Sequence, residues 1–530
     1  MRCMAIALVL TILASNSSAT DVEARRPNFV ILLADDLGFS DVGCYDGEIA
    51  TPNLDSLAAG GLRYTQFHNC ARCTPTRSAL LTGYYPQQVR LDDFPGAKKR
   101  KGPRQSWARL LPDYLRSVGY RSYHSGKWHL DGDPLENGFD HSYTLGDFDR
   151  NFYPAKHTLD GQPLPRVLPG SGYYTTTAII DHAVDFLKEH SANQADTPFF
   201  AYVAFQVPHF PLQAPASDIR RYEERYRDGW DAIRDARWKK IKEMLHLPGE
   251  LSSLETEIGP PYFYDSTEAA LGPNEVWHER PWDDLSEGQK RFQAAKMSAH
   301  AAMVDRMDQE IGQIVAQLKA MKALDNTVIM FLSDNGASAE LMIRGDGHDP
   351  SAPVGSAQSY VCLGPGWANA SNTPFRRHKC WVHEGGTATP LIVHWPAGIR
   401  AEGELRTQAV GHAVDLVPTM LELADAQVQN SEGAPTRPGL SLTATFNEDT
   451  AIDRPFLWWL HEGNRALRME NWKLVAGRDS PWELFDLSVD RAENNNLATK
   501  LPEKVMQLET EWLAAAEQFK ADRQEQAQTK

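Results

Sequence analysis

The chain has 530 residues, of which 54 are lysine or arginine and 70 are aspartate or glutamate, so its formal net charge is −16. This acidity excludes nucleic acid as a partner, because nucleic-acid phosphates need a basic face on the protein. An anionic small substrate would need a local cationic pocket, since the overall field of the protein repels it. The length is sufficient for one large core, or for a large domain with a smaller one attached.

The first twenty residues have the pattern of a secretory leader. They contain one early arginine, an apolar run from Met4 to Ala14, and small residues at Ser17 and Ala19 that suit cleavage. The apolar run is too short to span a bilayer, and no other segment is apolar enough to do so. We therefore predict a signal peptide over residues 1–20, an exported (periplasmic or secreted) protein, and no membrane span.

Four short apolar segments, each ending in polar residues, follow along the chain. They are Phe29–Ala34 before Asp35-Asp36, 120–124 before Gly126–His129, Phe199–Phe205 before Pro208-His209, and Val328–Leu332 before Ser333–Gly336. Such continuous runs are typical of parallel strands buried on both faces. Residues 173–190 and 299–324 carry apolar side chains at helical spacing. The alternation predicts an α/β fold with a large, mainly parallel sheet flanked by helices.

The pattern of apolar residues changes after residue 450. Short aromatic runs at Phe456–Leu460, Arg468–Val475 and Trp482–Asp486 indicate antiparallel strands, and a helix is expected from Pro502 onward. We therefore predict a catalytic domain over 21–450 and a smaller α+β subdomain with an antiparallel sheet over 451–530. The stretches 214–290 and 345–372 are predicted to be insertions over the crevice where the strands end.

Two pairs of oxygen-bearing side chains stand directly after predicted core strands. Asp35 and Asp36 follow the first strand, and Asp334 and Asn335 follow the fourth. Ligands of parallel sheets bind at the carboxyl ends of the strands, so the two pairs are expected to meet. Clustered carboxylates repel one another unless a cation holds them, and oxygen donors select a hard ion. A flexible cage suits Ca²⁺ better than Mg²⁺, which prefers to keep its waters.

A motif around Cys73 carries the most specific signal. Cys73-Thr74-Pro75-Thr76-Arg77, followed by Ser78-Ala79-Leu80-Leu81-Thr82-Gly83, resembles the sulfatase signature. Further blocks resemble sulfatase sequences in family order: Asp35–Asp41, Thr51–Asp55, Gly126–His129, Pro208-His209, Ser333–Gly336, and Lys379 with Glu384–Gly386. The run Gly364–Asn369 with Asn372–Arg376 is closer to the arylsulfatase-type subgroup. On these blocks the chain is identified as a member of the formylglycine-dependent type I sulfatase family.

The resemblance implies an alkaline-phosphatase-like fold and hydrolysis of sulfate monoesters, with a sulfated carbohydrate or an aryl sulfate as substrate. It implies that a formylglycine-generating enzyme oxidises Cys73 to an aldehyde, whose hydrate is the nucleophile. Carried over by position, Asp35, Asp36, Asp334 and Asn335 would hold calcium together with the converted Cys73.

The resemblance also implies roles for five other side chains. Arg77 would hold the hydrated aldehyde, and Lys127 and Lys379 would clamp sulfate oxygens. His209 would protonate the leaving alcohol, and His129 would assist the second hydroxyl of the hydrate in expelling sulfate. One departure is Asp131, which precedes Gly132 where many family members continue directly to glycine.

Two other functions stay open at this stage. Phosphodiesterases and phosphonate monoester hydrolases share the fold, the metal and the converted cysteine, and a non-catalytic binder of sulfated glycans could keep the scaffold. For substrate recognition, the turn that follows Phe456–Leu460 is expected to approach the leaving group. It offers His461, Glu462, Asn464 and Arg465, although turns are polar for local reasons as well. Cys44 and Cys380 are expected to be unpaired, buried thiols.

Overall fold

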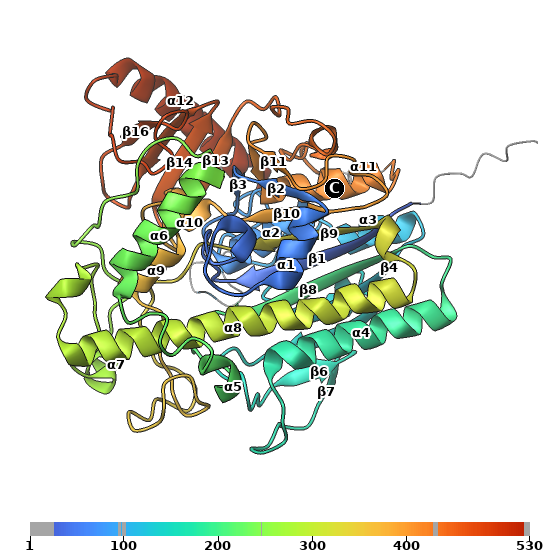
Figure 1. Ribbon diagram of the computed structural model, residues 1–530. Coiled ribbons are helices and arrows are strands. Elements are labelled where there is room, and N and C mark those ends of the chain that lie inside the picture. Colours follow the sequence, from blue (N-terminus) through green and yellow to red (C-terminus); the bar gives the residue numbers. More distant parts are fainter. Residues whose placement is uncertain (1–25, 94–96, 98–101, 245, 428–432, 524–530) are drawn as a thin grey trace, which may run out of the picture.

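The computed structural model describes residues 26–93, 97, 102–244, 246–427 and 433–523, so the predicted signal peptide lies outside the described residues. A ten-stranded sheet forms the centre of the molecule (Figure 1). Its strands, in spatial order, are β11 (Glu404–Arg406), β2 (Leu62–Tyr64), β10 (Leu391–His394), β9 (Thr327–Ser333), β1 (Asn28–Asp35), β8 (Phe199–Pro208), β4 (Arg121–Lys127), β5 (His141–Leu145), β6 (His157–Leu159) and β7 (Gln162–Pro163).

The four predicted core strands are confirmed as neighbours in this sheet. β1 lies between β8 and β9 and is parallel to both, so that Phe29 pairs with Phe200 on one side and with Val328 on the other. β4 continues the parallel order beyond β8. The carboxyl ends of β9, β1, β8 and β4 therefore lie along one edge of the sheet, which is where ligands of parallel sheets bind.

Both faces of the sheet are covered by helices, as the uninterrupted apolar strands require. Val30 and Leu32 of β1 belong to a core shared with α1 (Pro52–Ala59), α4 (Thr175–Asn193) and α8 (Glu287–Ala320). Ile31 and Leu33 point the other way, into a core shared with α2 (Cys73–Thr82), α3 (Leu111–Ser117) and α11 (Leu416–Leu423). Figure 1 shows α4 and α8 lying along one face of the sheet.

The predicted helices are present, but α8 begins twelve residues before the expected position. Ser286 and Gln289 form a capping box at its N-terminus, with the Ser286 hydroxyl accepting from the Gln289 N–H. The residues 287–291 that begin α8 include no apolar side chain and are exposed or only partly buried, so the apolar spacing that marks the helix begins after them. α8 also ends earlier than predicted, at Ala320.

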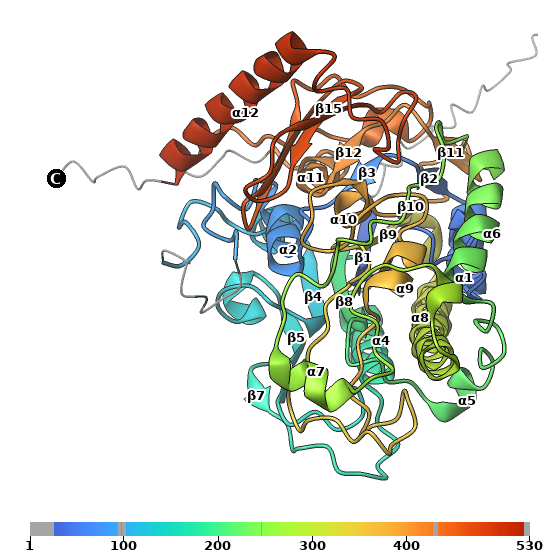
Figure 2. The ribbon, with the colours of Figure 1, turned by 90° about the vertical axis from the view of Figure 1, so that its left-hand side faces the viewer.

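The C-terminal region forms a second sheet, antiparallel, in the order β13 (Leu457–His461), β14 (Asn464–Met469), β15 (Trp472–Ala476) and β16 (Glu483–Asp486), with α12 (Pro502–Asp522) packed on it. In both views it lies on the opposite side of the molecule from α4 and α8 (Figures 1 and 2). The run Arg468–Val475, expected to be one strand, is divided by a turn at Glu470, whose φ is +53°. The division at residue 450 stays a prediction.

The other elements are short or lie in the long connections. They are α5 (Ala216–Ile219), α6 (Gly229–Met244), α7 (Asp265–Leu271), α9 (Pro365–Ser371), α10 (Glu384–Thr387), and a two-stranded sheet of β3 (Phe67–His68) and β12 (Gly411–His412). Cys44, Cys70, Cys73, Cys362 and Cys380 are all free thiols, with Cys44 only partly buried. No helix among the described residues combines the length and apolar character needed to cross a membrane.

Candidate active site

Helix α2 places Cys73 at the carboxyl edge of the main sheet. Cys73 is the first residue of the helix, where the backbone N–H groups and the helix dipole favour negative charge. Arg77 lies one turn further on and is completely buried. Its Nε and Nη2 donate to Oδ2 of Asp334 at 2.9 and 2.7 Å, and its Nη1 donates to the Lys127 carbonyl at 2.7 Å. Arg77 therefore joins α2 to the ends of β9 and β4.

Two buried lysines approach the aspartates that end β1. Lys127 Nζ donates to Asp35 Oδ2. Lys379 Nζ lies 2.8 Å from Asp36 Oδ1 and 2.7 Å from Glu340 Oε2. Asp36 has a φ of +67°, a left-handed conformation that turns the chain directly after the strand. The two pairs predicted to meet do so, because Asn335 Nδ2 donates to Asp36 Oδ1 at 2.7 Å.

The oxygens of this cluster fit a hard cation. Asp35 Oδ1, Asp334 Oδ1 and Asn335 Oδ1 are buried and have no hydrogen-bond partner. Burial and the neighbouring Asp35 carboxylate raise the pKa of Asp334, which shows how unfavourable adjacent negative charges are here. Ligand atoms of Asp35, Asp36 and His209 also lie within 4.8 Å of one another. Unpartnered buried acceptors are costly, and a divalent cation would satisfy them.

The two histidines of the site are buried and held in different ways. His129 has a φ of +57°, and its carbonyl accepts a hydrogen bond from the Thr74 hydroxyl at 3.1 Å. His209 follows β8, with Nδ1 2.6 Å from the Phe210 carbonyl, so Nδ1 carries a proton and Nε2 faces Asp36 at 3.8 Å. Burial lowers the pKa of both rings, assisted by Lys127 at His129 and by Lys379 at His209. A bound sulfate ester would add negative charge that opposes the effect of the lysines.

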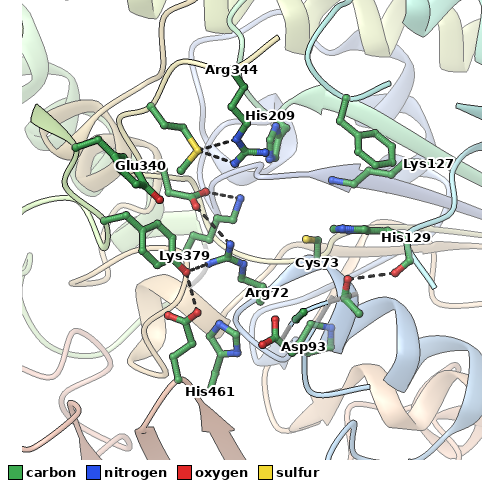
Figure 3. Close-up of a pocket in the computed structure, with 18 residues that line it drawn as sticks. Arg72, Cys73, Asp93, Lys127, His129, His209, Glu340, Arg344, Lys379 and His461 are labelled. Carbon is green, nitrogen blue, oxygen red and sulfur yellow. Dashed lines mark hydrogen bonds and ion pairs between the residues drawn. The ribbon is translucent and has the colours of Figure 1, made fainter. Parts of the chain in front are cut away.

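These groups open into one cavity of about 510 Å³ (Figure 3). Cys73, Lys127, His129, His209 and Lys379 all line it. Burial raises the pKa of the Cys73 thiol, while Lys127 and Lys379 act in the opposite direction. The cavity therefore brings a cysteine, two ammonium groups and two imidazoles together above the oxygen cluster. Such a site can hold a tetrahedral anion and place its ester oxygen beside an acid.

One wall of the cavity is formed by residues that the sequence did not single out. Arg72 donates to the Tyr262 hydroxyl at 2.6 Å and pairs with Glu340 at 3.5 Å. The Tyr262 hydroxyl in turn donates to Glu462 Oε1 at 2.8 Å. Tyr262 belongs to the charged, aromatic insertion, and Glu340 lies in the irregular segment after β9. The only available signal was for Arg72, which directly precedes Cys73.

The four predicted substrate residues separate into two groups. His461 and Glu462 line the cavity. Asn464 is committed to the backbone, donating to the Cys380 carbonyl and accepting from the Arg478 N–H. Arg465 donates to two carbonyls near residue 480 and lies over the Trp482 ring, outside the cavity lining. The structure therefore brings two of the four to the site.

His461 is polar but unsatisfied. It is 4% exposed, and neither ring nitrogen has a hydrogen-bond partner. Burial, followed by the charge of Arg72, lowers its pKa to about 3, so the ring is neutral at ordinary pH and offers one donor and one acceptor. By contrast, Asp131 accepts from the Arg104 N–H at 2.8 Å and does not line the cavity.

Comparison with known proteins identifies the family. Residues 27–426 match the family model described as Sulfatase. The chain belongs to the sulfatase family. A second model, described as N-sulphoglucosamine sulphohydrolase, C-terminal, matches residues 376–518 of this sulfatase. The family and its named relatives make the protein a sulfuric ester hydrolase of the arylsulfatase-like kind.

Similar proteins cover almost the whole chain. This sulfatase is 31% identical over 544 residues to an uncharacterized sulfatase of Schizosaccharomyces pombe, with 93% of each chain covered. It is 30% identical over 476 residues to an arylsulfatase of Klebsiella aerogenes, covering 83% of this chain and 95% of the relative. An N-acetylgalactosamine-6-O-sulfatase of Bacteroides thetaiotaomicron is 27% identical over 517 residues, with 92% of each covered.

Solved structures confirm the alkaline-phosphatase-like fold. Ps i-CgsB in complex with k-i-k-neocarrahexaose superposes with a TM-score of 0.67 at 22% identity, covering 95% of this chain and 94% of that chain. The phosphonate monoester hydrolase of Agrobacterium radiobacter superposes with a TM-score of 0.58 at 18% identity, covering 93% and 96%. PsFucS1, a neighbour named as a sulfatase, superposes with a TM-score of 0.62. Enzymes named as a sulfatase and as a phosphonate monoester hydrolase therefore share this architecture, and the side chains of the site must distinguish between their substrates.

Proposed function

We propose that this sulfatase is exported and hydrolyses sulfate monoesters of carbohydrates or aryl alcohols, with formylglycine made from Cys73 and a bound calcium ion. The observation that carries the proposal is the convergence of Cys73, Lys127 and Lys379 on one cavity above three buried, unpartnered oxygens. Export rests on the leader pattern of residues 1–20. The relatives named for 6-O-sulfated amino sugars support a sulfated carbohydrate substrate.

The residues of the cavity have separate tasks in this proposal. Lys127 and Lys379 bind the sulfate oxygens from different sides and hold the sulfur in line with residue 73. Arg77 fixes the start of α2 against Asp334 and compensates negative charge at the nucleophile. His209 Nδ1–H is held by the Phe210 carbonyl, so the acid is Nε2, which takes up a second proton when the anionic ester is bound and gives it to the oxygen of the leaving alcohol. His129 takes the proton that must leave residue 73 when sulfate is released.

Two groups complete the chemistry. Asp35, Asp36, Asp334 and Asn335, with an oxygen of the converted Cys73, would hold calcium, which when bound stabilises negative charge on the sulfate. Conversion of Cys73 by a formylglycine-generating enzyme would supply an aldehyde hydrate, with one hydroxyl to attack sulfur and a second for releasing sulfate. The conversion also explains why a cysteine with a raised pKa lies at a catalytic position.

Parallel assays of sulfate and phosphate esters test this function. Protein produced with a formylglycine-generating enzyme is expected to hydrolyse 4-nitrophenyl sulfate with a higher kcat/KM than bis(4-nitrophenyl) phosphate, because in this proposal Lys127 and Lys379 both bind sulfate oxygens. Preference for the phosphodiester would instead support the alternative hydrolase. Binding of sulfated glycans without turnover of either ester by fully converted protein would support a non-catalytic binder.

His461 is expected to contribute to recognition of the alcohol part of a sugar substrate. A buried donor and acceptor that meet a sugar hydroxyl contribute about 1–3 kcal/mol, or about 5- to 150-fold in kcat/KM. We expect His461→Phe to lower the ratio of kcat/KM for N-acetylgalactosamine 6-sulfate or N-acetylglucosamine 6-sulfate to that for 4-nitrophenyl sulfate by this factor. The melting temperature should be maintained or raised, since two unsatisfied buried nitrogens are removed.

Arg465→Ala is the matched control, since Arg465 lies in the same hairpin but outside the cavity lining. It should leave the substrate ratio unchanged. Equal losses on sugar and aryl sulfates after His461→Phe would mean that His461 has a structural role, and an unchanged ratio would remove it from the recognition site.

A further inference from the structure

Arg344 lies at the margin of the catalytic cavity and has no anionic partner among the residues that the structure describes. Its side chain is exposed, and its Nε and Nη2 donate to the Met342 sulfur at 3.0 and 2.6 Å (Figure 3). A thioether is a weak acceptor, so these contacts hold the guanidinium in place without neutralising it. Throughout the described residues no carboxylate forms an ion pair with Arg344.

Within the described part of the chain, the other cations that line the cavity are paired with carboxylates. Lys127 contacts Asp35, Lys379 contacts Asp36 and Glu340, and Arg72 contacts Glu340. A guanidinium without a carboxylate partner is unexpected in a chain of net charge −16, because acidic residues outnumber basic ones. Its positive charge is therefore available to a ligand in the cavity.

Arg344 lies on the same side of the cavity as His209. Its guanidinium carbon is 5.1 Å from the centre of the Phe210 ring, and the His209 ring stacks on the same ring at 4.0 Å. Figure 3 shows Arg344 and His209 at the same margin of the cavity, with Lys127 and His129 around Cys73. In the proposed function His209 protonates the leaving oxygen, so the part of the substrate nearest Arg344 is the alcohol.

We propose that Arg344 is a specificity-determining residue that binds a second anionic group, a carboxylate or a sulfate, on the alcohol part of the substrate. This proposal rests on the proposed sulfatase function and names the substrate class more closely, as a sulfate ester whose alcohol carries a further negative charge. Guanidinium groups bind carboxylates and sulfates through two parallel hydrogen bonds. An anion is a stronger acceptor than the Met342 thioether and would replace it as the partner of Arg344.

The test uses four aryl sulfates with the fully converted enzyme: 4-nitrophenyl sulfate, 3-carboxyphenyl sulfate, 4-carboxyphenyl sulfate and benzene-1,4-diol bis-sulfate. In wild-type protein, kcat/KM is expected to be higher for at least one anionic ester than its leaving group alone would give. Arg344→Gln should lower the ratio of kcat/KM for that ester to kcat/KM for 4-nitrophenyl sulfate by about 10- to 100-fold. Comparison of the carboxyphenyl sulfates with the bis-sulfate shows whether Arg344 prefers a carboxylate or a sulfate.

Arg150→Gln is the control, because it removes the same charge from a nearby guanidinium that pairs with Asp147 and Asp346 and does not line the cavity. It should leave the ratio unchanged. The same variants in a Cys73→Ala background, titrated calorimetrically with the same esters, measure binding without turnover. They keep the Arg344 proposal testable if the enzyme fails to hydrolyse 4-nitrophenyl sulfate, a result that would contradict the proposed function alone. Equal effects of Arg344→Gln on all esters, or none, would overturn the Arg344 proposal.

Discussion

Replacement of Cys73 by alanine is expected to lower kcat for 4-nitrophenyl sulfate by at least about 10⁴-fold, as removal of a nucleophile does in other hydrolases. Cys73→Ser should also lose turnover, for a different reason. A serine hydroxyl can take the sulfuryl group, but it lacks the second hydroxyl that releases it. The serine variant is therefore expected to give at most one product per active site, measured as a burst without a steady state.

Both variants should keep the fold, because Cys73 faces a cavity and serine has nearly the same size. Cys70→Ser is the matched control, since Cys70 is another buried thiol close in sequence that does not line the cavity. It should retain turnover. Mass spectrometry of the wild-type peptide should show sulfur replaced by oxygen with loss of two hydrogens. Fully active enzyme carrying only the unmodified thiol would contradict the mechanism.

Much of the fold could be predicted because the central strands are buried on both faces and therefore leave uninterrupted apolar runs. β1 and β9 follow directly from this pattern, and so does the prediction that Asp35 and Asp334 lie at the same edge. Helix boundaries were harder to predict, because the residues 287–291 that begin α8 include no apolar side chain. The short turn at Glu470 was missed because the residues on both sides have similar β-forming composition.

The parts of the site that the sequence did not reveal come from irregular segments. Glu340, Tyr262 and Arg344 lie outside regular strands and helices, so no periodicity marks which way their side chains point. In the turn after β13, too, the sequence did not show which side chains reach the cavity. His461 and Glu462 reach the cavity whereas Arg465 faces the other side of the hairpin, because successive strand residues alternate and the turn residues follow local geometry.

Removal of the proposed calcium ion is expected to lower both the melting temperature and the activity. Without a cation, the carboxylates of Asp35 and Asp334 repel each other, and the buried oxygens of Asp35, Asp334 and Asn335 have neither water nor a hydrogen-bond donor as a partner. Both effects destabilise the folded protein. At a calcium concentration 100 times Kd, binding adds about 2.7 kcal/mol to the free energy of unfolding. Thermal unfolding after chelation, followed by titration with calcium, measures this increment independently of catalysis. A melting temperature that does not respond to calcium would contradict a calcium site.

Asp334→Asn should abolish the calcium response and lower kcat at least about 100-fold, a loss typical of removing one charge-stabilising group. The substitution also weakens the contacts with buried Arg77, which lowers stability whether or not a metal is present. Asp41→Asn separates the two effects. Asp41 is equally buried and pairs with Arg237 and His300, away from the oxygen cluster. Both variants should melt at lower temperature, but only Asp334→Asn should lose the increase on adding calcium, because Asp334 has an unpartnered buried oxygen in the cluster and Asp41 does not.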